Sequence, residues 1–329
     1  MKALEHFFDS KKHLFTKGGK LELLYPVYEA ADTFLFTPDS VTQVDVHVKD
    51  SIDLKRTMMT VVYAMIPCVL FALWNTGYQA NLILSSGKFQ AIGWRHELLV
   101  ALGLTHDPAN FFSNLVYGAS FFIPVWIVCN VVGGLCEVLF ATIRKHEMNE
   151  GFLVTGWLIP LIMPPTVPLW QVAIGTAFGV IVAKEIFGGT GKNIFNPALM
   201  ARAFLFFAYP AQMSGDSVWT AVDSYTGATA LSQAAVGGIS SVSVSWWDSF
   251  IGIEFGSMGE TSALACLIGM GVLIFTGVGS WRIMLACFIG MTGMSLIFNS
   301  IGSTTNPMFA VTPEWHFVLG SFAFATAFM

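Results

Sequence analysis

Charged side chains are scarce in this chain. Only 11% of its 329 residues are Asp, Glu, Lys or Arg, whereas a typical soluble domain has roughly 25%. Hydrophobic residues make up 54% of the chain, and the mean hydropathy is +0.65. So few charges cannot coat a soluble fold of this size, and the net charge of −5 argues against a nucleic-acid partner. The composition therefore excludes a soluble enzyme, a disordered chain and a nucleic-acid binder, and it predicts a polytopic membrane protein.

Metal-binding and targeting patterns are also missing. The histidines show no i,i+3 or i,i+4 pairing, which argues against a metal or haem site, and no residue stands out as catalytic. No cleavable signal peptide precedes the first apolar run, because residues 1–56 are polar and charged. The five cysteines lie in apolar runs without CxxC spacing, and we interpret them as small hydrophobic residues: Cys68, Cys129, Cys136, Cys266 and Cys287.

Long apolar runs predict an all-α fold, a polytopic helical bundle in the membrane. A spanning helix needs roughly 20 mostly apolar residues. We expect a cytoplasmic segment at 1–56, with weakly amphipathic stretches, and a transmembrane domain at 57–329. The candidate spans are 57–75, 113–142, 152–166, 168–187, 198–213, 260–279 and 283–300.

Three features interrupt this pattern. Pro164, Pro165 and Pro168 predict a tight hairpin between the third and fourth candidate spans. The run 198–213 is short and contains Tyr209-Pro210, which is typical of a half-helix. The run 316–329 is too short to span and is interpreted as an incomplete last helix. An internal repeat of several helices, as in many transporters, is compatible with the pattern but is not established by it.

The lysines and arginines predict the orientation. If the spans alternate, all of these residues except Lys88 and Arg95 fall on one face. Because cytoplasmic loops carry the excess of basic residues, the N-terminus is predicted to be cytoplasmic. The polar stretch 214–258 then lies on the outer face, and the stretch 188–197 on the inner face.

A few ionisable residues lie within or at the ends of these runs, where they are costly and usually functional. Glu137 follows Gly133-Gly134 near the inner end of the second span. Two interpretations stay open for Glu137, namely a groove that binds a polar ring or a cation, and a buried hydrogen bond between helices. Lys184 and Glu185 are expected to extend to the interface.

Two glycine-containing turns are the remaining motifs. The stretch 187–193 lacks the spacing of a phosphate-binding loop, and it is interpreted either as a turn or as backbone close to an embedded cofactor. On the outer face, Thr226-Gly227-Ala228-Thr229 precedes a short apolar run, so Thr229 is predicted to cap a helix over 230–235.

A series of segments runs in order along nearly the whole chain. They are residues 51–56 (SIDLKR), 132–134 (VGG), 137–140 (EVLF), 144–152 (RKHEMNEGF), 183–191 (AKEIFGGTG), 196–199 (NPAL) and 202–212 (RAFLFFAYPAQ). Through these segments the chain resembles the B-subunit family of the sodium-translocating NADH:quinone oxidoreductase (NQR complex). The D subunit of the Rnf electron-transport complex is related and shares the fold and the threonine motif.

The resemblance implies a covalent cofactor. In this family a flavin transferase attaches FMN through a phosphoester to the last hydroxyl of an Asp-Gly-x-Ser/Thr-Gly-Ala-Ser/Thr motif. Residues 223–229 match this spacing and depart from it at Ser224, where the family usually has glycine. Thr229 would carry the FMN, and Asp223, Thr226, Gly227 and Ala228 would form the recognition motif.

The resemblance also implies noncovalent riboflavin, ubiquinone as substrate, and a quinone region that includes Gly133, Gly134 and Glu137. The expected setting is a multi-pass protein of the bacterial inner membrane, surrounded by lipid, with the flavin loop in the periplasm. Other subunits of the complex would complete a pump that couples electron transfer to sodium export. Two other functions stay open on the residues alone, namely a cofactor-free channel or transporter for a small polar solute, and an Rnf D-type subunit.

Overall fold

The computed structural model describes residues 2–16, 18–25, 27–29, 32, 36, 54–144, 151–215, 218–219, 221–222 and 225–329. Within these ranges the chain is helical and forms no β-strand, only an isolated antiparallel bridge between Trp219 and Gly227. Three helices of the described part are long and apolar enough to cross a membrane: α3 (Leu54–Ser85), α5 (Phe111–Arg144) and α13 (Trp281–Ile301). The predicted all-α membrane fold is confirmed.

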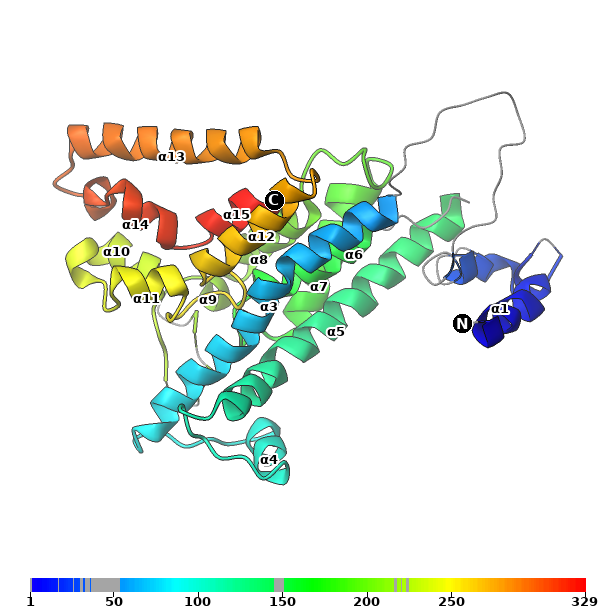
Figure 1. Ribbon diagram of the computed structural model, residues 1–329, viewed down its shortest axis with the longest axis horizontal. Coiled ribbons are helices and arrows are strands. Elements are labelled where there is room, and N and C mark those ends of the chain that lie inside the picture. The colour runs from blue at the N-terminus through cyan, green and yellow to red at the C-terminus, as the bar shows by residue number, and fades with distance from the viewer. Residues whose placement is uncertain are drawn as a thin grey trace.

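Helices α3 and α5 lie side by side along the length of the bundle (Figure 1) and are joined through α4 (Trp94–Ala101). The two helices cross closely because each has a glycine at the point of contact. A Cβ added at Gly118 would collide with the carbonyl oxygen of Leu73, and one added at Gly77 with that of Asn114.

Helix α3 extends ten residues beyond the predicted span 57–75. The extension contains the polar residues Gln79 and Asn81, whose side chains are buried and hydrogen-bonded. Gln79 Nε2 donates to Asn75 Oδ1 at 3.3 Å, and Asn81 Nδ2 donates to Asn114 Oδ1 at 2.9 Å. A satisfied polar group does not end a helix, so the polarity was a poor guide to the boundary.

Short helices fill the centre of the bundle. α6 (Gly151–Leu161) and α7 (Leu169–Val180) are joined by the proline turn, as predicted, and α7 continues into a π-helical turn at Ile181–Glu185. α8 (Pro197–Ala208) begins where Asn196 Oδ1 accepts from the backbone N–H groups of Ala198 and Leu199. It ends before Pro210, which starts α9 (Pro210–Met213), so the predicted half-helix is confirmed.

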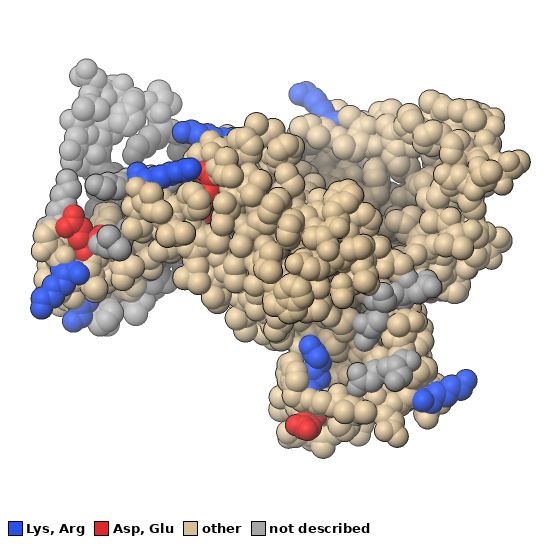
Figure 2. All heavy atoms as spheres, turned by 180° about the vertical axis from the view of Figure 1, so that it is seen from behind, with Lys and Arg blue, Asp and Glu red and all other residues tan. Residues whose placement is uncertain are grey.

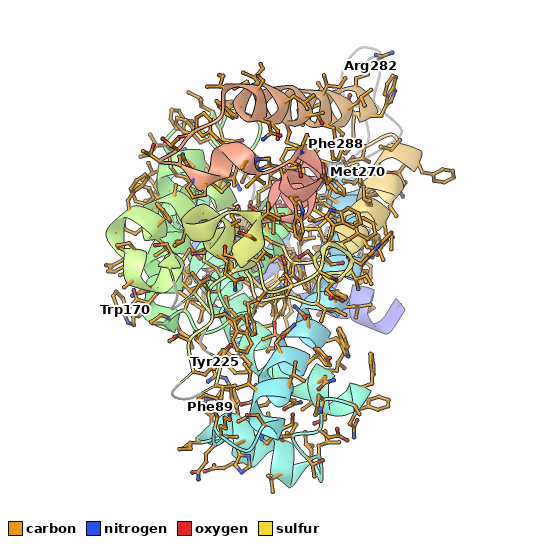
Figure 3. All side chains as sticks on the ribbon, turned by 90° about the vertical axis from the view of Figure 1, so that its left-hand side faces the viewer. Phe89, Trp170, Tyr225, Met270, Arg282 and Phe288 are labelled. Carbon is orange, nitrogen blue, oxygen red and sulfur yellow. The ribbon has the colours of Figure 1, made fainter. Side chains whose placement is uncertain are left out.

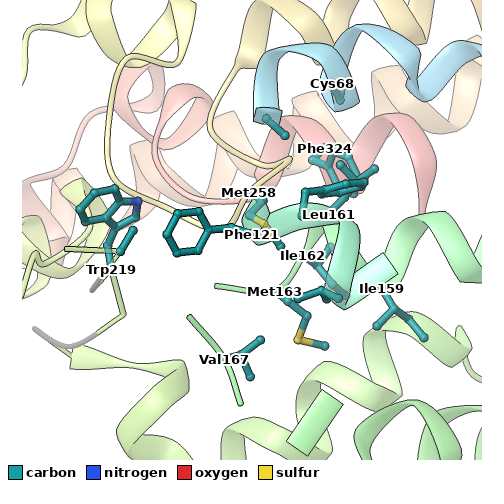
Figure 4. Close-up of a cluster of buried hydrophobic side chains, with 14 of the residues drawn as sticks. Cys68, Phe121, Ile159, Leu161, Ile162, Met163, Val167, Trp219, Met258 and Phe324 are labelled. Carbon is teal, nitrogen blue, oxygen red and sulfur yellow. The ribbon is translucent and has the colours of Figure 1, made fainter. Parts of the chain in front are cut away.

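The polar stretch 214–258 folds back onto these half-helices. It contains α10 (Ala230–Gly237) and α11 (Trp246–Ile251). Met258 N donates to the Met163 carbonyl at 3.1 Å, and Gly259 N to that of Leu161 at 2.7 Å. Met258 lies with Leu161 and Met163 in one buried cluster (Figure 4). The stretch therefore covers the turn between α6 and α7 and is part of the core.

The last part of the chain is α12 (Ala263–Phe275), α13, α14 (Pro313–Val318) and α15 (Phe322–Phe328). Within the run 316–329, which was interpreted as an incomplete last helix, Gly320, with φ of +69°, separates α14 from α15. That the last helix is incomplete stays a prediction. The remaining helical segments are α1 (Lys2–Phe15) and the short 3-10 turns Glu22–Leu24, Ile239–Ser241 and Pro307–Ala310.

The surface of the bundle is apolar. In Figure 2 the few charged side chains lie at the periphery, and a broad region between them is uncharged. Along α13, which lies at one edge of the molecule, Ile283, Ile289 and Ile297 are exposed, and Figure 3 shows side chains projecting outward from this helix. Exposed apolar area of this extent fits a lipid environment.

Candidate cofactor site

Thr229 is the N-cap of α10. Its Oγ1 accepts a hydrogen bond from Ser232 N at 3.2 Å, so the predicted cap is confirmed, and the helix runs two residues further than expected. Cap bonds of this kind satisfy a backbone donor that the helix itself leaves free. The turn before the cap is held by Gln233 Nε2, which donates to the Ala228 carbonyl at 3.2 Å. The hydroxyl at the end of the threonine motif is therefore held in a defined position.

The rest of the motif approaches Thr229 through a short backbone bridge. Gly227 N donates to the Trp219 carbonyl at 2.9 Å, and Trp219 N to the Gly227 carbonyl at 3.3 Å. A Cβ at Gly227 would lie 3.1 Å from the Phe255 ring, tighter than most side-chain contacts. Thr226 is exposed, whereas Asp223 and Ser224 lie outside the described residues.

The aromatic residue of the motif anchors the turn. Tyr225 packs against Phe89, with ring centroids 5.5 Å apart, and both are visible in Figure 3. It also contacts the buried Trp219 and Phe255. Burial of the phenol raises the pKa of Tyr225 above its usual value.

Thr229 borders a cavity of about 500 Å³. The walls come from α8, the end of α9 with the residues after it, α10, the stretch before α12 and the turn between α14 and α15. The lining residues are Arg202, Phe206, Met213, Ser214, Gly215, Val218, Thr229, Leu231, Ser232, Ala235, Glu254, Phe255, Gly256, Ser257, Glu260, Thr261, Gly320 and Ser321. Small-molecule and cofactor sites are typically about 300–1,000 Å³, so the space beside the threonine has the size of such a site.

Arg202 supplies the positive charge of this cavity. Its Nη1 donates to Glu260 Oε2 at 2.6 Å and to Ser257 Oγ at 3.1 Å, and it also contacts the Ile162 carbonyl. That carbonyl lies just beyond α6, where a helix accumulates negative partial charge. The sequence pattern did not single out Arg202 as a site residue, although its charge inside an apolar run was a usable signal.

Glu254 is the second carboxyl group of the cavity. It is only 5% exposed, and Ser249 Oγ donates to its Oε2 at 2.7 Å. Burial raises the pKa of Glu254 to about 8, and the bond from Ser249 opposes this in part. The carboxyl is therefore mostly protonated at neutral pH, whereas Glu260 is ion-paired with Arg202.

The predicted quinone region lies elsewhere, near the Arg144 end of α5 (Figure 1). Glu137 Oε1 accepts a hydrogen bond from Lys184 Nζ, and both side chains are 3% exposed. The expectation that Lys184 and Glu185 extend to the interface is wrong, since both are buried. The π-helical turn that carries them faces α5, which brings the lysine to Glu137. Of the two interpretations of Glu137, the structure shows a buried polar contact between helices, here an ion pair.

The two glycines before Glu137 have different surroundings. A Cβ at Gly133 would collide with the Phe152 ring on α6, whereas one at Gly134 would meet nothing within 4 Å. Gly133 therefore allows α5 and α6 to approach, and Gly134 borders open space.

The glycine-rich stretch 187–193 forms a turn beside this pair. Gly189 N donates to the Lys184 carbonyl at 3.1 Å, which ends the π-helical turn, and Gly188, Gly189 and Gly191 all have positive φ. Arg144 Nη1 donates to the Glu185 carbonyl at 2.6 Å and lies 3.8 Å from its Oε2. That carboxylate oxygen has no hydrogen-bond partner among the described residues.

Two histidines that do not form an i,i+3 or i,i+4 pair in the sequence are in contact in the fold. His96 Nδ1 lies 2.9 Å from His106 Nε2, and His106 Nδ1 lies 2.7 Å from Asn81 Oδ1. Burial, and then the proximity of His96, lower the pKa of His106. Within the described part of the chain, no three His, Cys, Asp or Glu side chains are placed to hold a metal ion.

Three of the cysteines pack in the interior. Cys68, Cys129 and Cys266 are buried, Cys136 is partly buried, Cys287 is exposed, and all five are free thiols. The sulfur atoms of Cys68 and Cys266 lie 3.8 Å apart between α3 and α12.

Comparison with known proteins identifies relatives over almost the full chain. A model of the NQR2, RnfD, RnfE family matches residues 41–329. The B subunit of the Na(+)-translocating NADH-quinone reductase of Stutzerimonas stutzeri is 55% identical over 333 residues, which cover 99% of this chain and 82% of that protein. The protein of the same name from Chromohalobacter salexigens is 53% identical over 329 residues, which cover 99% of this chain and 80% of that protein.

Proposed function

Because the chain belongs to the NQR2, RnfD, RnfE family, we propose that it is the membrane-embedded B subunit of a sodium-translocating NADH:quinone oxidoreductase and carries FMN covalently on Thr229. The observation that carries the flavin proposal is the position of Thr229. Its side chain lies on a fixed turn, at the edge of a cavity of cofactor size that also holds a guanidinium group.

The residues present fit an FMN group. The cavity is large enough for a small cofactor, and its walls combine the apolar rings of Phe206 and Phe255 with polar donors from Arg202 and Ser257. A phosphoester on Thr229 would lie at the N-terminus of α10, where backbone N–H groups and the helix dipole favour negative charge. The flavin ring could then occupy the cavity.

The flavin supplies one- and two-electron chemistry, and the protein supplies position and electrostatics. Thr229 fixes the distance of the ring from its redox neighbours. The bridge between Trp219 and Gly227 holds the turn that carries Thr229. Arg202 and Glu260 provide a paired charge at the cavity wall, and the protonated Glu254 adds a neutral donor there.

The quinone part of the proposal rests on a different region. Gly133, Gly134 and Glu137 would contribute to ubiquinone binding, and the open space beside Gly134 is compatible with that role. Lys184 would hold Glu137 in place. We further propose bound riboflavin, sodium export by the assembled complex, a flavin transferase for maturation, and an inner-membrane location with the flavin loop in the periplasm.

Covalent attachment is tested by Thr229→Val, expressed with the flavin transferase. Wild-type protein should show flavin fluorescence in a denaturing gel, and peptide mapping should find the mass of FMN within residues 214–240. Thr229→Val should lack both signals, because valine has no hydroxyl to esterify. Thr304→Val, which removes an exposed hydroxyl far along the chain, is the matched control and should keep both. Undiminished fluorescence of Thr229→Val, or a colourless wild-type protein, contradicts the proposal.

Membership in the complex is tested separately. The matched family also includes RnfD and RnfE, which would share a covalent flavin but not the partner subunits. Co-purification of the tagged chain from its native membrane, followed by mass spectrometry, identifies those partners. Recovery of Rnf subunits in place of the NADH-quinone reductase subunits would contradict the assignment.

A further inference from the structure

The guanidinium of Arg202 is only partly used by the protein. All its hydrogen bonds to described residues come from Nη1. Nε and Nη2 carry further N–H donors, and these have no acceptor among the described residues. The side chain keeps 30% of its surface exposed and lines the cavity beside Thr229. One edge of the guanidinium is therefore held by the fold, and the other meets no acceptor in the described part of the chain.

The contacts of Arg202 with described residues involve only the Nη1 edge of the guanidinium. Nη1 meets the carbonyl of Ile162 beyond α6 and pairs with Glu260 on the segment before α12. These contacts connect α6, α8 and that segment. They fix the orientation of the guanidinium plane, because a planar fork held at one nitrogen has little rotational freedom left.

The hydrogen-bond donors of the cavity, rather than its net charge, favour an electron-rich ligand. Glu260, 8% exposed, is bonded to Arg202 and stays close to it. Glu254 is the other carboxyl in the lining, and its raised pKa leaves it mostly uncharged at neutral pH. Among the described residues, the lining thus contains one paired carboxylate, one neutral carboxyl and a guanidinium whose Nε and Nη2 donors have no acceptor.

We propose that Arg202 is a positioning and redox-tuning residue, which donates to the pyrimidine edge of the flavin ring anchored on Thr229 and stabilises its reduced form. This inference rests on the proposed function and deepens it. Uptake of two electrons and one proton leaves the reduced ring with one negative charge, centred on the N1–C2=O edge. The electrons come from NADH through the complex. A fixed cation at that edge makes reduction more favourable, since charge-assisted hydrogen bonds are the stronger kind.

The phosphate is the competing partner for Arg202. Thr229 sits at the start of α10, so backbone N–H groups at that helix end can donate to its phosphoester. That leaves Arg202 for the ring. If Arg202 bound the phosphate instead, replacing Arg202 would weaken the contacts that hold the phosphate. The midpoint potential of the flavin ring would then stay nearly unchanged.

The test is a spectroelectrochemical titration of the purified complex. Arg202→Gln combined with Glu260→Gln removes both charges, so that no buried carboxylate is left unpaired. We expect at least a tenfold shift toward oxidised covalent FMN at a given ambient potential, which corresponds to a midpoint lower by about 30 mV for a two-electron couple. Glu260→Gln alone should shift the midpoint upward, because it leaves the positive charge of Arg202 uncompensated. A purely structural role predicts no such change of sign.

Two controls make the result decisive. The complex with Thr229→Val lacks the covalent flavin and identifies which redox component belongs to it. Arg282→Gln removes an arginine at the start of α13 that is not part of the cavity lining, and it should leave every midpoint unchanged.

Unshifted midpoints in both Glu260→Gln and the double variant, with the FMN mass intact, overturn the inference while the attachment stands. Absence of that mass from the wild-type chain overturns the proposed function itself. If the double variant fails to assemble, Glu260→Gln and Arg202→Lys are measured, and equal midpoints in both overturn the inference.

Discussion

The buried ion pair between Lys184 and Glu137 leads to the sharpest stability prediction. Both side chains are 3% exposed, and they join the π-helical turn after α7 to α5. Replacing Lys184 with Met keeps the length of the side chain but leaves the Glu137 carboxylate buried without its partner. Breaking a buried pair in this way costs about 3–5 kcal/mol. We expect a loss of this size in the free energy of unfolding of Lys184→Met.

Removal of both charges should cost much less. In the double variant with Glu137→Gln and Lys184→Met, no uncompensated charge stays in the protein interior. Replacing a whole buried pair by neutral groups is often close to neutral in stability. The double variant should therefore be more stable than Lys184→Met alone, and the coupling energy from the double-mutant cycle should be about 2 kcal/mol or more.

Denaturant unfolding in lipid–detergent micelles, followed with a thiol-reactive dye, measures these differences. The assay suits this chain because Cys68, Cys129 and Cys266 are buried and free and become reactive on unfolding. Lys192→Met is the matched control on the exposed glycine-rich turn and should stay within about 0.5 kcal/mol of wild type. A cost for Lys184→Met no larger than that of the control would refute the reasoning, as would a double variant less stable than the single.

Three further predictions follow from the structure. Glu254→Gln should remove a pH-dependent loss of stability. The pKa of Glu254 in the folded protein, about 8, exceeds its ordinary value of 4.5, so the folded state keeps a proton that the unfolded state releases. The free energy of unfolding of the wild type should therefore fall by a few kcal/mol as the pH rises from 4.5 to about 8. Equal pH dependence of the free energy of unfolding in variant and wild type would contradict this. Gly133→Ala should lower the unfolding midpoint, because its Cβ meets the Phe152 ring, whereas Gly134→Ala should not, and equal midpoints for the two would exclude that contact. Gly118→Ala should prevent the close crossing of α3 and α5, so little folded protein should elute at the native position in size-exclusion chromatography; wild-type yield would refute the crossing.

The sequence alone established the fold class and most of the element order. Scarce charge and long apolar runs predict helices in a membrane, because a helix satisfies its own backbone hydrogen bonds within one apolar run. The proline turn at 163–168, the half-helix before Pro210 and the cap at Thr229 were also predictable, because each depends on a local constraint of proline or of a short polar side chain. The element ends in α3 and in the run 316–329 were not predictable, since buried polar contacts and one glycine decide them.

Tertiary structure decided the partners of the ionisable residues. Lys184 lies at the end of an apolar run, as lysines at a membrane interface do. Only the packing of the π-helical turn on α5 places its nitrogen beside Glu137. Arg202 is separated from Glu260 by 58 positions, and no periodicity links the two. The threonine could be selected from its motif, but the cavity beside it comes from five segments that are separated in the sequence. Local chemistry is encoded within a few residues, whereas a cavity and its charge balance exist only once distant segments have packed together.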